Sequence, residues 1–140
     1  PNFAGIKDTV DCQSHTRSMI QTTRAVREDF AVLSGYDEYY IPNLLAGGAG
    51  IISGLNNVMP ELFVSAREAF KQGDLAALRD IQDQIGTYMS IYAIGEDFVT
   101  TIKTVVSRKF GYCSGVSRNA GGELNESECR TIDEVFVVKG

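Results

Sequence analysis

Three short apolar runs, separated by segments with helical patterning, constrain the fold of this chain more than any other feature. The runs are Phe3–Ile6, Phe30–Leu33 and Gly50–Ser53. Each is apolar throughout rather than alternating, as expected for strands that are covered on both faces. A helix is expected over about residues 15–27, with Met19, Ile20 and Ala25 available for its inner side, and another over about residues 38–45. Repeated strand–helix units with short links predict an α/β fold with a parallel sheet, either doubly wound or closed as a barrel.

The chain changes character after Gln72-Gly73, where helical patterning takes over. A helix capped by Asp74 is predicted, with apolar residues at helical spacing: Leu75, Leu78, Ile81, Ile85 and Met89. A second helix is expected over about residues 97–110, and Ser127 or Thr131 begins a last short helix. The sequence therefore predicts a strand–helix segment followed by a helical segment.

Three strands are too few to close a barrel. A sheet containing only these strands would leave edge groups and apolar surface exposed. The chain opens Pro1-Asn2-Phe3, without an initiator Met or an apolar leader. We therefore expect an upstream half of the sheet, or a partner that replaces it.

Composition and charge narrow the classes of partner. The chain is 44% hydrophobic and 22% charged, as in ordinary soluble proteins, and carries a net charge of -5 with scattered Lys and Arg. This argues against a nucleic-acid partner, which requires clustered positive charge. The uncharged stretch Tyr39–Pro60 is long enough for a membrane span, but its proline, glycines and asparagines fit a helix and a strand better. No membrane segment is predicted.

Several enzyme and metal-site classes lack their motifs here. The closely spaced glycines of residues 47–54 do not form G-x-G-x-x-G, and no G-K-[ST] follows, so nucleotide binding is not predicted. His15 is the only histidine and is expected on a helix surface or at a cap, without a G-x-S-x-G motif to complete a catalytic triad. Three cysteines without C-x-x-C spacing predict no metal site and no disulfide framework, and favour a reducing cytoplasm.

Lys7 directly follows the first apolar run, where the predicted strand ends. Barrel active sites are built at this carboxyl end of the strands. An apolar setting disfavours the ammonium form of lysine, and the neutral amine is the form that attacks a ketone to give an imine. From position alone, a lysine that extends to water is the better interpretation.

Polar residues follow the first two predicted strands. Thr9 could place a hydroxyl near a substrate bound at Lys7, although Asp8-Thr9 is also ordinary in a turn before a helix. Asp37 and Glu38 could accept hydrogen bonds from sugar hydroxyls, or could merely cap the next helix. The local pattern alone favours the structural interpretation in both cases.

Three motifs in order resemble the dihydrodipicolinate synthase/N-acetylneuraminate lyase family. They are Gly5-Ile6-Lys7-Asp8-Thr9, Val32-Leu33-Ser34-Gly35-Tyr36-Asp37 and Leu45-Ala46-Gly47-Gly48-Ala49-Gly50-Ile51-Ile52-Ser53, followed by Pro60-Glu61-Leu62 and Gly73-Asp74-Leu75-Ala76. The resemblance covers most of residues 1–112. It implies that residues 1–72 hold strands six to eight of a (β/α)₈ TIM barrel, as its C-terminal half, and that residues 73–140 form a C-terminal helical domain.

The resemblance also implies roles for individual residues. Lys7 matches the Schiff-base lysine, and Thr9 matches a threonine that contacts substrate in sialic-acid lyases and 2-keto-3-deoxy sugar-acid aldolases. Gly35 and Ile52 match positions whose backbone lines the pyruvate site. The remaining positions expected to bind substrate are Asp37 and Glu38, matching a pair that holds sugar hydroxyls, and Ser53.

The motifs that distinguish the subfamilies of this family do not all match the same subfamily. Lys7-Asp8-Thr9 is similar to the 2-keto-3-deoxy sugar-acid aldolases, whereas dihydrodipicolinate synthases usually show Lys-Glu followed by Ala. Gly35-Tyr36-Asp37-Glu38 is similar to the sialic-acid lyases, but Ser53-Gly54 reverses their usual Gly-Ser. The expected reaction is cleavage or formation of a 2-keto-3-deoxy sugar acid from pyruvate and an aldehyde. Dihydrodipicolinate synthase, N-acetylneuraminate lyase and a non-catalytic interaction module remain the alternatives.

The family's other machinery lies outside this chain. Its catalytic tyrosine and the Gly-Thr-Thr-Gly-Glu-type loop that holds the pyruvate carboxylate belong to the first half of the barrel. The chain alone is therefore expected to be inactive, and the upstream half of the barrel is its expected partner. The resemblance further implies a homotetramer and no metal or organic cofactor.

Overall fold

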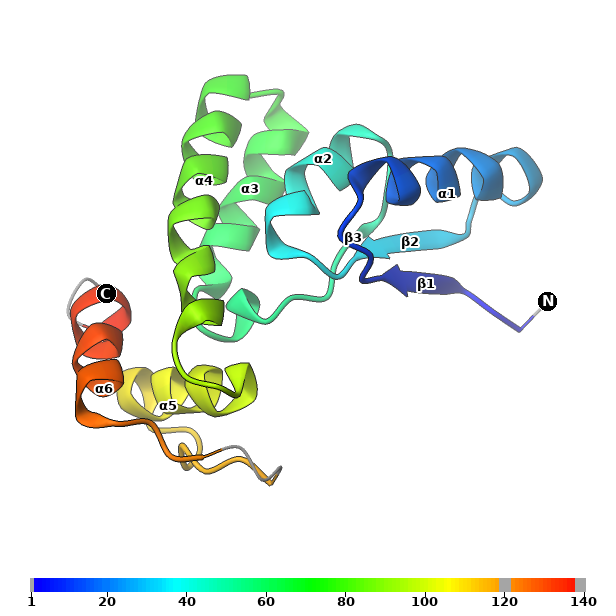
Figure 1. The fold of residues 1–140 in the computed structure, drawn as a ribbon. Coiled ribbons are helices and arrows are strands. Elements are labelled where there is room, and N and C mark those ends of the chain that lie inside the picture. Colours follow the sequence, from blue (N-terminus) through cyan, green and yellow to red (C-terminus); the bar gives the residue numbers. More distant parts are fainter. Residues whose placement is uncertain (1, 119–121, 138–140) are drawn as a thin grey trace. The chain divides into compact units, whose positions relative to one another are not determined.

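The computed structural model describes residues 2–118 and 122–137 (Figure 1). The chain divides into two compact units. The first contains residues 1–53 and 61–85, and the second contains residues 54–60 and 86–140. This division differs from the change of character at residue 72, and the domain boundary expected there stays a prediction.

The first unit is built on a parallel three-stranded sheet in the order β1-β2-β3. The strands are β1 (Gly5–Asp8), β2 (Ala31–Ser34) and β3 (Gly50–Ile51). All three lie within or directly beside the apolar runs, which confirms the parallel α/β arrangement. The first two strands begin one or two residues later than predicted, because the pairing begins with the bond from the Ala31 N–H to the Ala4 carbonyl (2.9 Å).

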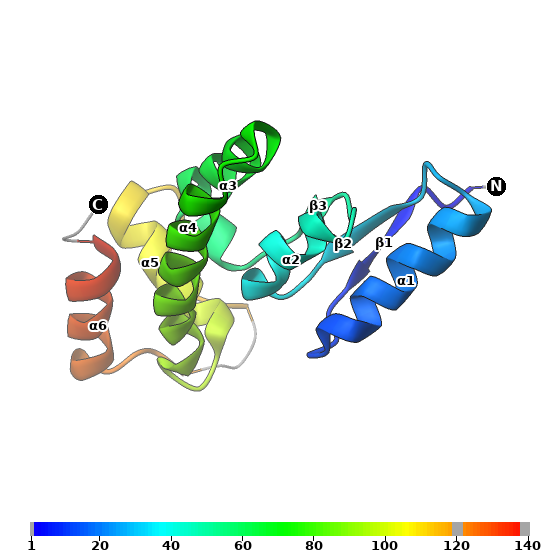
Figure 2. The same cartoon turned by 90° about the horizontal axis from the view of Figure 1, so that it is seen from above.

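Two helices cover one face of this sheet, as Figures 1 and 2 show: α1 (Gln13–Val26) and α2 (Tyr40–Leu45), the latter preceded by the 3₁₀ turn η1 (Asp37–Tyr39). Ile20 of α1 and Leu44 of α2 are buried there. Val32 and Ser34 of β2 are buried as well. Since successive strand residues point to opposite faces, the residues between them lie on the other face of the sheet.

Two burial predictions for this unit were wrong. Phe3 and Ile6 are 80% and 42% exposed, so the run that leads into β1 is not buried. β1 pairs only with β2 among the described residues, which leaves its outer edge open. Ala25 is also exposed, although it was expected on the inner side of α1, where Ile20 is buried as predicted.

A helical hairpin completes the first unit, formed by α3 (Pro60–Gln72) and most of α4 (Leu75–Tyr88). Gly73 allows the sharp turn between them, because its φ of +70° lies in the left-handed region that favours glycine. Asp74 caps α4 as predicted, accepting a hydrogen bond from the Ala77 N–H (2.9 Å). The apolar stripe of α4 is buried at Leu78, Ile81 and Ile85, but Leu75 is 70% exposed.

The second unit is helical: η2 (Leu55–Asn57), η3 (Met89–Ala93), α5 (Phe98–Phe110), α6 (Glu126–Ile132) and the π-helical turn η4 (Asp133–Val137). Its core includes Ile91, Val105, Ile132 and Phe136. Asp97 caps α5 by accepting from the N–H groups of Val99 and Thr100. Asn125 and Glu128 form a capping box at the start of α6, which explains why this helix begins one residue before Ser127. No described helix is both long enough and apolar enough to cross a bilayer.

Gly5 is required by the close approach of β1 to β2, and we expect Gly5→Ala to destabilise the fold by about 1–3 kcal/mol. An added Cβ would lie 2.3 Å from the Ala31 carbonyl oxygen and 2.8 Å from the Ala31 Cβ. The first of these contacts is with backbone, so the strands themselves would have to separate. Urea unfolding measures the change.

Gly86 provides the matched control for this substitution. It is exposed in α4, and an added Cβ would meet nothing within 4 Å. Gly86→Ala should therefore stabilise the chain by about 0.5–1 kcal/mol, since alanine loses less backbone entropy in a helix. Equal effects of the two substitutions would contradict the steric explanation for Gly5.

Candidate active site

The predicted site residues lie at the carboxyl ends of the three parallel strands. Lys7 is in β1, Gly35 directly follows β2, and Ile52 directly follows β3. The strand ladder continues to this edge, because the Gly35 N–H donates to the Asp8 carbonyl (2.6 Å) and the Ile52 N–H donates to the Ser34 carbonyl (2.9 Å). The structure therefore brings three separate motifs to one edge of the sheet.

Lys7 and Thr9 converge on Gly35. A Cβ built on Gly35 would lie 2.2 Å from the Thr9 Oγ1 and 2.9 Å from the Lys7 Cε. The space that a side chain at position 35 would need is thus taken by the lysine stem and the threonine hydroxyl. Lys7 pairs with Leu33 in the ladder and is exposed, so its amine is accessible on the face of the sheet that points away from α1.

Asp37 and Ser53 meet at the ends of β2 and β3. Asp37, at the start of η1, is only 2% exposed, and its Oδ1 accepts a hydrogen bond from the Ser53 hydroxyl. The next residue, Glu38, is half-buried, and its backbone carbonyl accepts from the Gln82 Nε2 (3.0 Å). The structure thus joins two of the side chains expected to bind substrate, Asp37 and Ser53, directly.

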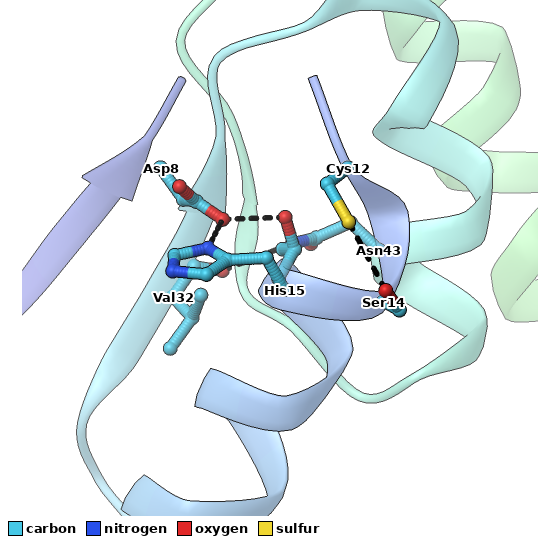
Figure 3. A network of polar contacts seen from close by, with 7 residues as sticks. Asp8, Cys12, Ser14, His15, Val32 and Asn43 are labelled. Carbon is cyan, nitrogen blue, oxygen red and sulfur yellow. Dashed lines mark hydrogen bonds and ion pairs between the residues drawn. The ribbon is translucent and has the colours of Figure 1, made fainter. Parts of the chain in front are cut away.

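Asp8 forms a polar cluster on the opposite face of β1, beneath α1 (Figure 3). Asp8 is 5% exposed, and its Oδ2 accepts a hydrogen bond from the Thr16 hydroxyl (2.5 Å) and lies 3.0 Å from the His15 Nδ1. Burial opposes ionisation of this carboxyl, but the hydrogen bonds from Thr16 and His15 outweigh it and lower the pKa of Asp8. Asp8 is therefore held as a carboxylate that ties β1 to the first turn of α1.

This cluster was not predicted from the sequence. Asp8 was expected only in a turn, and His15 was expected on the helix surface, where it is about half exposed. The sequence does contain a pattern that could have indicated the cluster. A carboxylate follows an apolar run, and His15 and Thr16 lie in the first turn of the next helix. A buried carboxylate requires such donors.

Two tyrosines beside the site have partners inside the chain. The Tyr39 hydroxyl donates to the Asp11 Oδ1 (2.6 Å), and this bond raises the pKa of Tyr39 to about 12. Tyr40 is buried, and its ring centroid lies 5.7 Å from that of Phe63. Tyr39 therefore fixes the loop between β1 and α1 to η1, while Tyr40 packs against Phe63.

Within the part of the chain that the structure describes, the cysteines and acidic residues do not gather into a metal-binding group. Cys12, Cys113 and Cys129 are free thiols. Across the described residues, no group of three or more His, Cys, Asp or Glu side chains is arranged to hold a metal ion.

The chain is similar in sequence to a known protein family over nearly its whole length. The sequence profile of the Dihydrodipicolinate synthetase family matches residues 1–135. This chain belongs to that family. The membership confirms the resemblance carried by the motifs around Lys7, Gly35 and Ile52.

Individual members of the dihydrodipicolinate synthetase family are similar over most of the chain. The probable 2-dehydro-3-deoxy-D-pentonate aldolase YjhH of Escherichia coli K12 is 40% identical over 102 residues, which cover 73% of this chain and 34% of that protein. The 4-hydroxy-tetrahydrodipicolinate synthase of Methanoculleus marisnigri is 33% identical over 140 residues, or 47% of its length. The chain therefore spans only about a third to a half of the relatives that it matches.

A solved family member has the same fold over this region. The crystal structure of YagE from Escherichia coli K12, in complex with pyruvate, superposes with a TM-score of 0.89 and 30% identity. The superposition covers 96% of this chain and 45% of YagE. YagE is thus a family member of related sequence whose crystal contains the keto acid expected for this site.

Proposed function

We propose that this chain contributes strands six to eight of a (β/α)₈ barrel and the imine-forming lysine of a class I aldolase. The observation that carries the proposal is the convergence of Lys7 and Thr9 on Gly35, at the carboxyl edge of a parallel sheet. The open outer edge of β1 and the exposed face that bears Lys7 support the expectation that further strands complete the barrel. The pyruvate complex of YagE supports pyruvate as the keto acid.

The preferred substrate is a 2-keto-3-deoxy sugar acid. Two observations support it: the Lys7-Asp8-Thr9 motif, and the names of YjhH and YagE, which are described as probable or putative aldolases of 2-dehydro-3-deoxy sugar acids. In this proposal the backbone at Gly35 and Ile52 lines the keto-acid end. Thr9, Glu38 and the Asp37–Ser53 pair would orient the hydroxylated tail.

The reaction would begin at the Lys7 Nζ. The neutral amine attacks the keto carbon, a nitrogen–carbon bond forms, and the carbonyl oxygen leaves as water, giving an iminium after uptake of a proton. A base removes the proton of the hydroxyl β to the iminium carbon, and the adjacent carbon–carbon bond breaks. Its electron pair moves into the iminium to give an enamine as the aldehyde leaves. The enamine takes up a proton, and water then hydrolyses the pyruvyl imine to pyruvate and free Lys7.

The base and the carboxylate-binding loop are proposed to come from the upstream half of the barrel. On this proposal, residues 1–140 alone would bind no pyruvate productively and would be inactive. The complete protein would need neither a metal nor an organic cofactor, would act in the cytoplasm, and would assemble as a homotetramer.

Reductive trapping tests the proposal directly. The complete gene product is incubated with pyruvate and borohydride, and the peptide that contains Lys7 is then weighed. We expect a reduced pyruvyl adduct on Lys7, because borohydride reduces the imine to a stable amine. A folded protein without this adduct would refute the aldolase and would favour the non-catalytic interaction module.

Substrate profiling separates the two enzymatic alternatives. Cleavage of 2-keto-3-deoxy pentonate or gluconate supports the proposed substrate. Preferential condensation of pyruvate with aspartate semialdehyde would instead identify a dihydrodipicolinate synthase, the activity for which the Methanoculleus marisnigri relative is named. Cleavage of sialic acid would support the second alternative, which the Gly35-Tyr36-Asp37-Glu38 motif favours.

A further inference from the structure

We infer that Asp8 is a positioning residue: held by Thr16 and His15, it anchors the end of β1 so that Lys7 and Thr9 meet over Gly35. This inference rests on the proposed function of Lys7. It assigns a role in the same site to three residues that lie on the far side of the strand from the amine.

Side chains alternate between the two faces of β1. Lys7 is exposed on one face of the strand, while Asp8 is 5% exposed on the other. A buried carboxylate is costly unless it is hydrogen-bonded. Both groups that satisfy it belong to consecutive residues of α1, His15 and Thr16, and Thr16 is itself 4% exposed. The cluster therefore fixes the distance between the strand and the helix.

Asp8 is held from two directions. Its side chain is bonded to α1, and its backbone carbonyl accepts the Gly35 N–H at 2.6 Å. Gly35 is the same residue over which the Lys7 stem and the Thr9 hydroxyl converge. Asp8 thus connects α1, the end of β1 and Gly35 of the proposed site.

The connection between β1 and α1 is short. Only residues 9–12 separate Asp8 from the start of α1. Thr9 is the first of them, and Asp11 is tied to Tyr39. With Asp8 fixed at one end and Asp11 held near the other, the backbone of Thr9 has little freedom to move. Release of Asp8 from Thr16 should therefore displace Lys7 and Thr9 together.

The test compares four variants of α1 in the complete gene product, at Thr16, Thr23 and His15. Thr16→Val removes the hydroxyl with nearly unchanged shape, and Thr16→Ser keeps it. Thr23→Val is the matched control, because among the described residues the Thr23 hydroxyl bonds only to carbonyls of its own helix, at Met19 and Ile20. The readouts are the rate at which pyruvate is trapped on Lys7 by borohydride, kcat and KM for the sugar acid, and the melting temperature.

We expect Thr16→Val to slow trapping about 10-fold and to lower kcat/KM similarly, since small displacements of reacting groups are costly. Thr16→Ser should recover most of both rates, and Thr23→Val should leave them unchanged. His15→Leu, at a position about half exposed, should fold even if Thr16→Val does not, and should slow trapping about 3-fold, as expected for loss of one hydrogen bond.

A double-mutant comparison tests whether the effect reaches Thr9. If Asp8 acts through Thr9, the rise in sugar-acid KM caused by Thr16→Val should shrink in a Thr9→Val background. A lower melting temperature with unchanged trapping in both Thr16→Val and His15→Leu would overturn the inference and leave the cluster a purely structural one. Failure of the wild-type protein to form the adduct would instead refute the proposed function, and the inference with it.

Discussion

Lys7→Arg should abolish turnover, with kcat/KM reduced by about 10⁴-fold or more, while the protein stays folded. Arginine keeps the positive charge but remains protonated at any ordinary pH, so it supplies no nucleophilic nitrogen. Without the nucleophile no iminium forms, and the electron pair of the breaking carbon–carbon bond has no acceptor. Lys7→Met should have an equal effect, because it removes the amine but retains an unbranched side chain. Steady-state cleavage of the sugar acid and trapping with pyruvate and borohydride provide the two measurements.

The control for this prediction is another lysine of the first unit. Lys71 lies near the end of α3, is more than half exposed and pairs with Glu68. Exposed pairs of this kind contribute little to stability. Lys71→Met should therefore preserve both the trapped adduct and the turnover. If Lys7→Arg retained a tenth or more of wild-type activity, charge rather than nucleophilicity would explain the role of Lys7, and the imine mechanism would be wrong.

The fold could be predicted from sequence wherever the determining interactions are local. The three strands and the helix starts at Asp74 and Asp97 follow from apolar runs and capping side chains, which act within a few residues. The incorrect predictions concern burial that depends on contacts with residues distant in the sequence. Leu75 fits the apolar stripe of α4 yet is 70% exposed, and the position of a stripe does not say which residues another element will cover.

The candidate site, too, depends partly on local sequence and partly on tertiary pairing. Position alone favoured a water-facing Lys7, and only its place among three ordered motifs reversed that interpretation. The convergence on Gly35 depends on the register of β1 with β2, where Lys7 lies opposite Leu33. The burial of Asp8 depends on α1 folding back over the strand. Both are consequences of tertiary pairing, which the local pattern of charges and glycines does not encode.

Gly35→Ala is expected to reduce kcat/KM by about 10²-fold with little loss of stability, the reverse of the effect predicted for Gly5→Ala. At Gly5 the added Cβ would meet the Ala31 backbone, whereas at Gly35 the nearest atoms are the Thr9 Oγ1 at 2.2 Å, the Thr9 Cβ at 2.8 Å and the Lys7 Cε at 2.9 Å. Rotation of the Thr9 and Lys7 side chains relieves the contacts with Oγ1 and Cε, and a small shift of the loop that begins at Thr9 relieves the contact with its Cβ, so β1 and β2 need not separate. The rotation nevertheless turns the lysine and the hydroxyl away from their shared position, and the cost falls on the reaction instead.

The rate of pyruvate trapping and the melting temperature, each measured for Gly35→Ala and Gly5→Ala, test this explanation. Gly35→Ala should show slow trapping of pyruvate with a melting temperature near that of wild type, and Gly5→Ala should show a clear loss of melting temperature. Adding Thr9→Ala to Gly35→Ala removes the contact with the Thr9 Oγ1 but leaves those with the Thr9 Cβ and the Lys7 Cε, so only part of the trapping rate should return. Full trapping in Gly35→Ala alone would show that the space over Gly35 is not where the lysine reacts, and the site would have to be sought elsewhere along the carboxyl edge of the sheet.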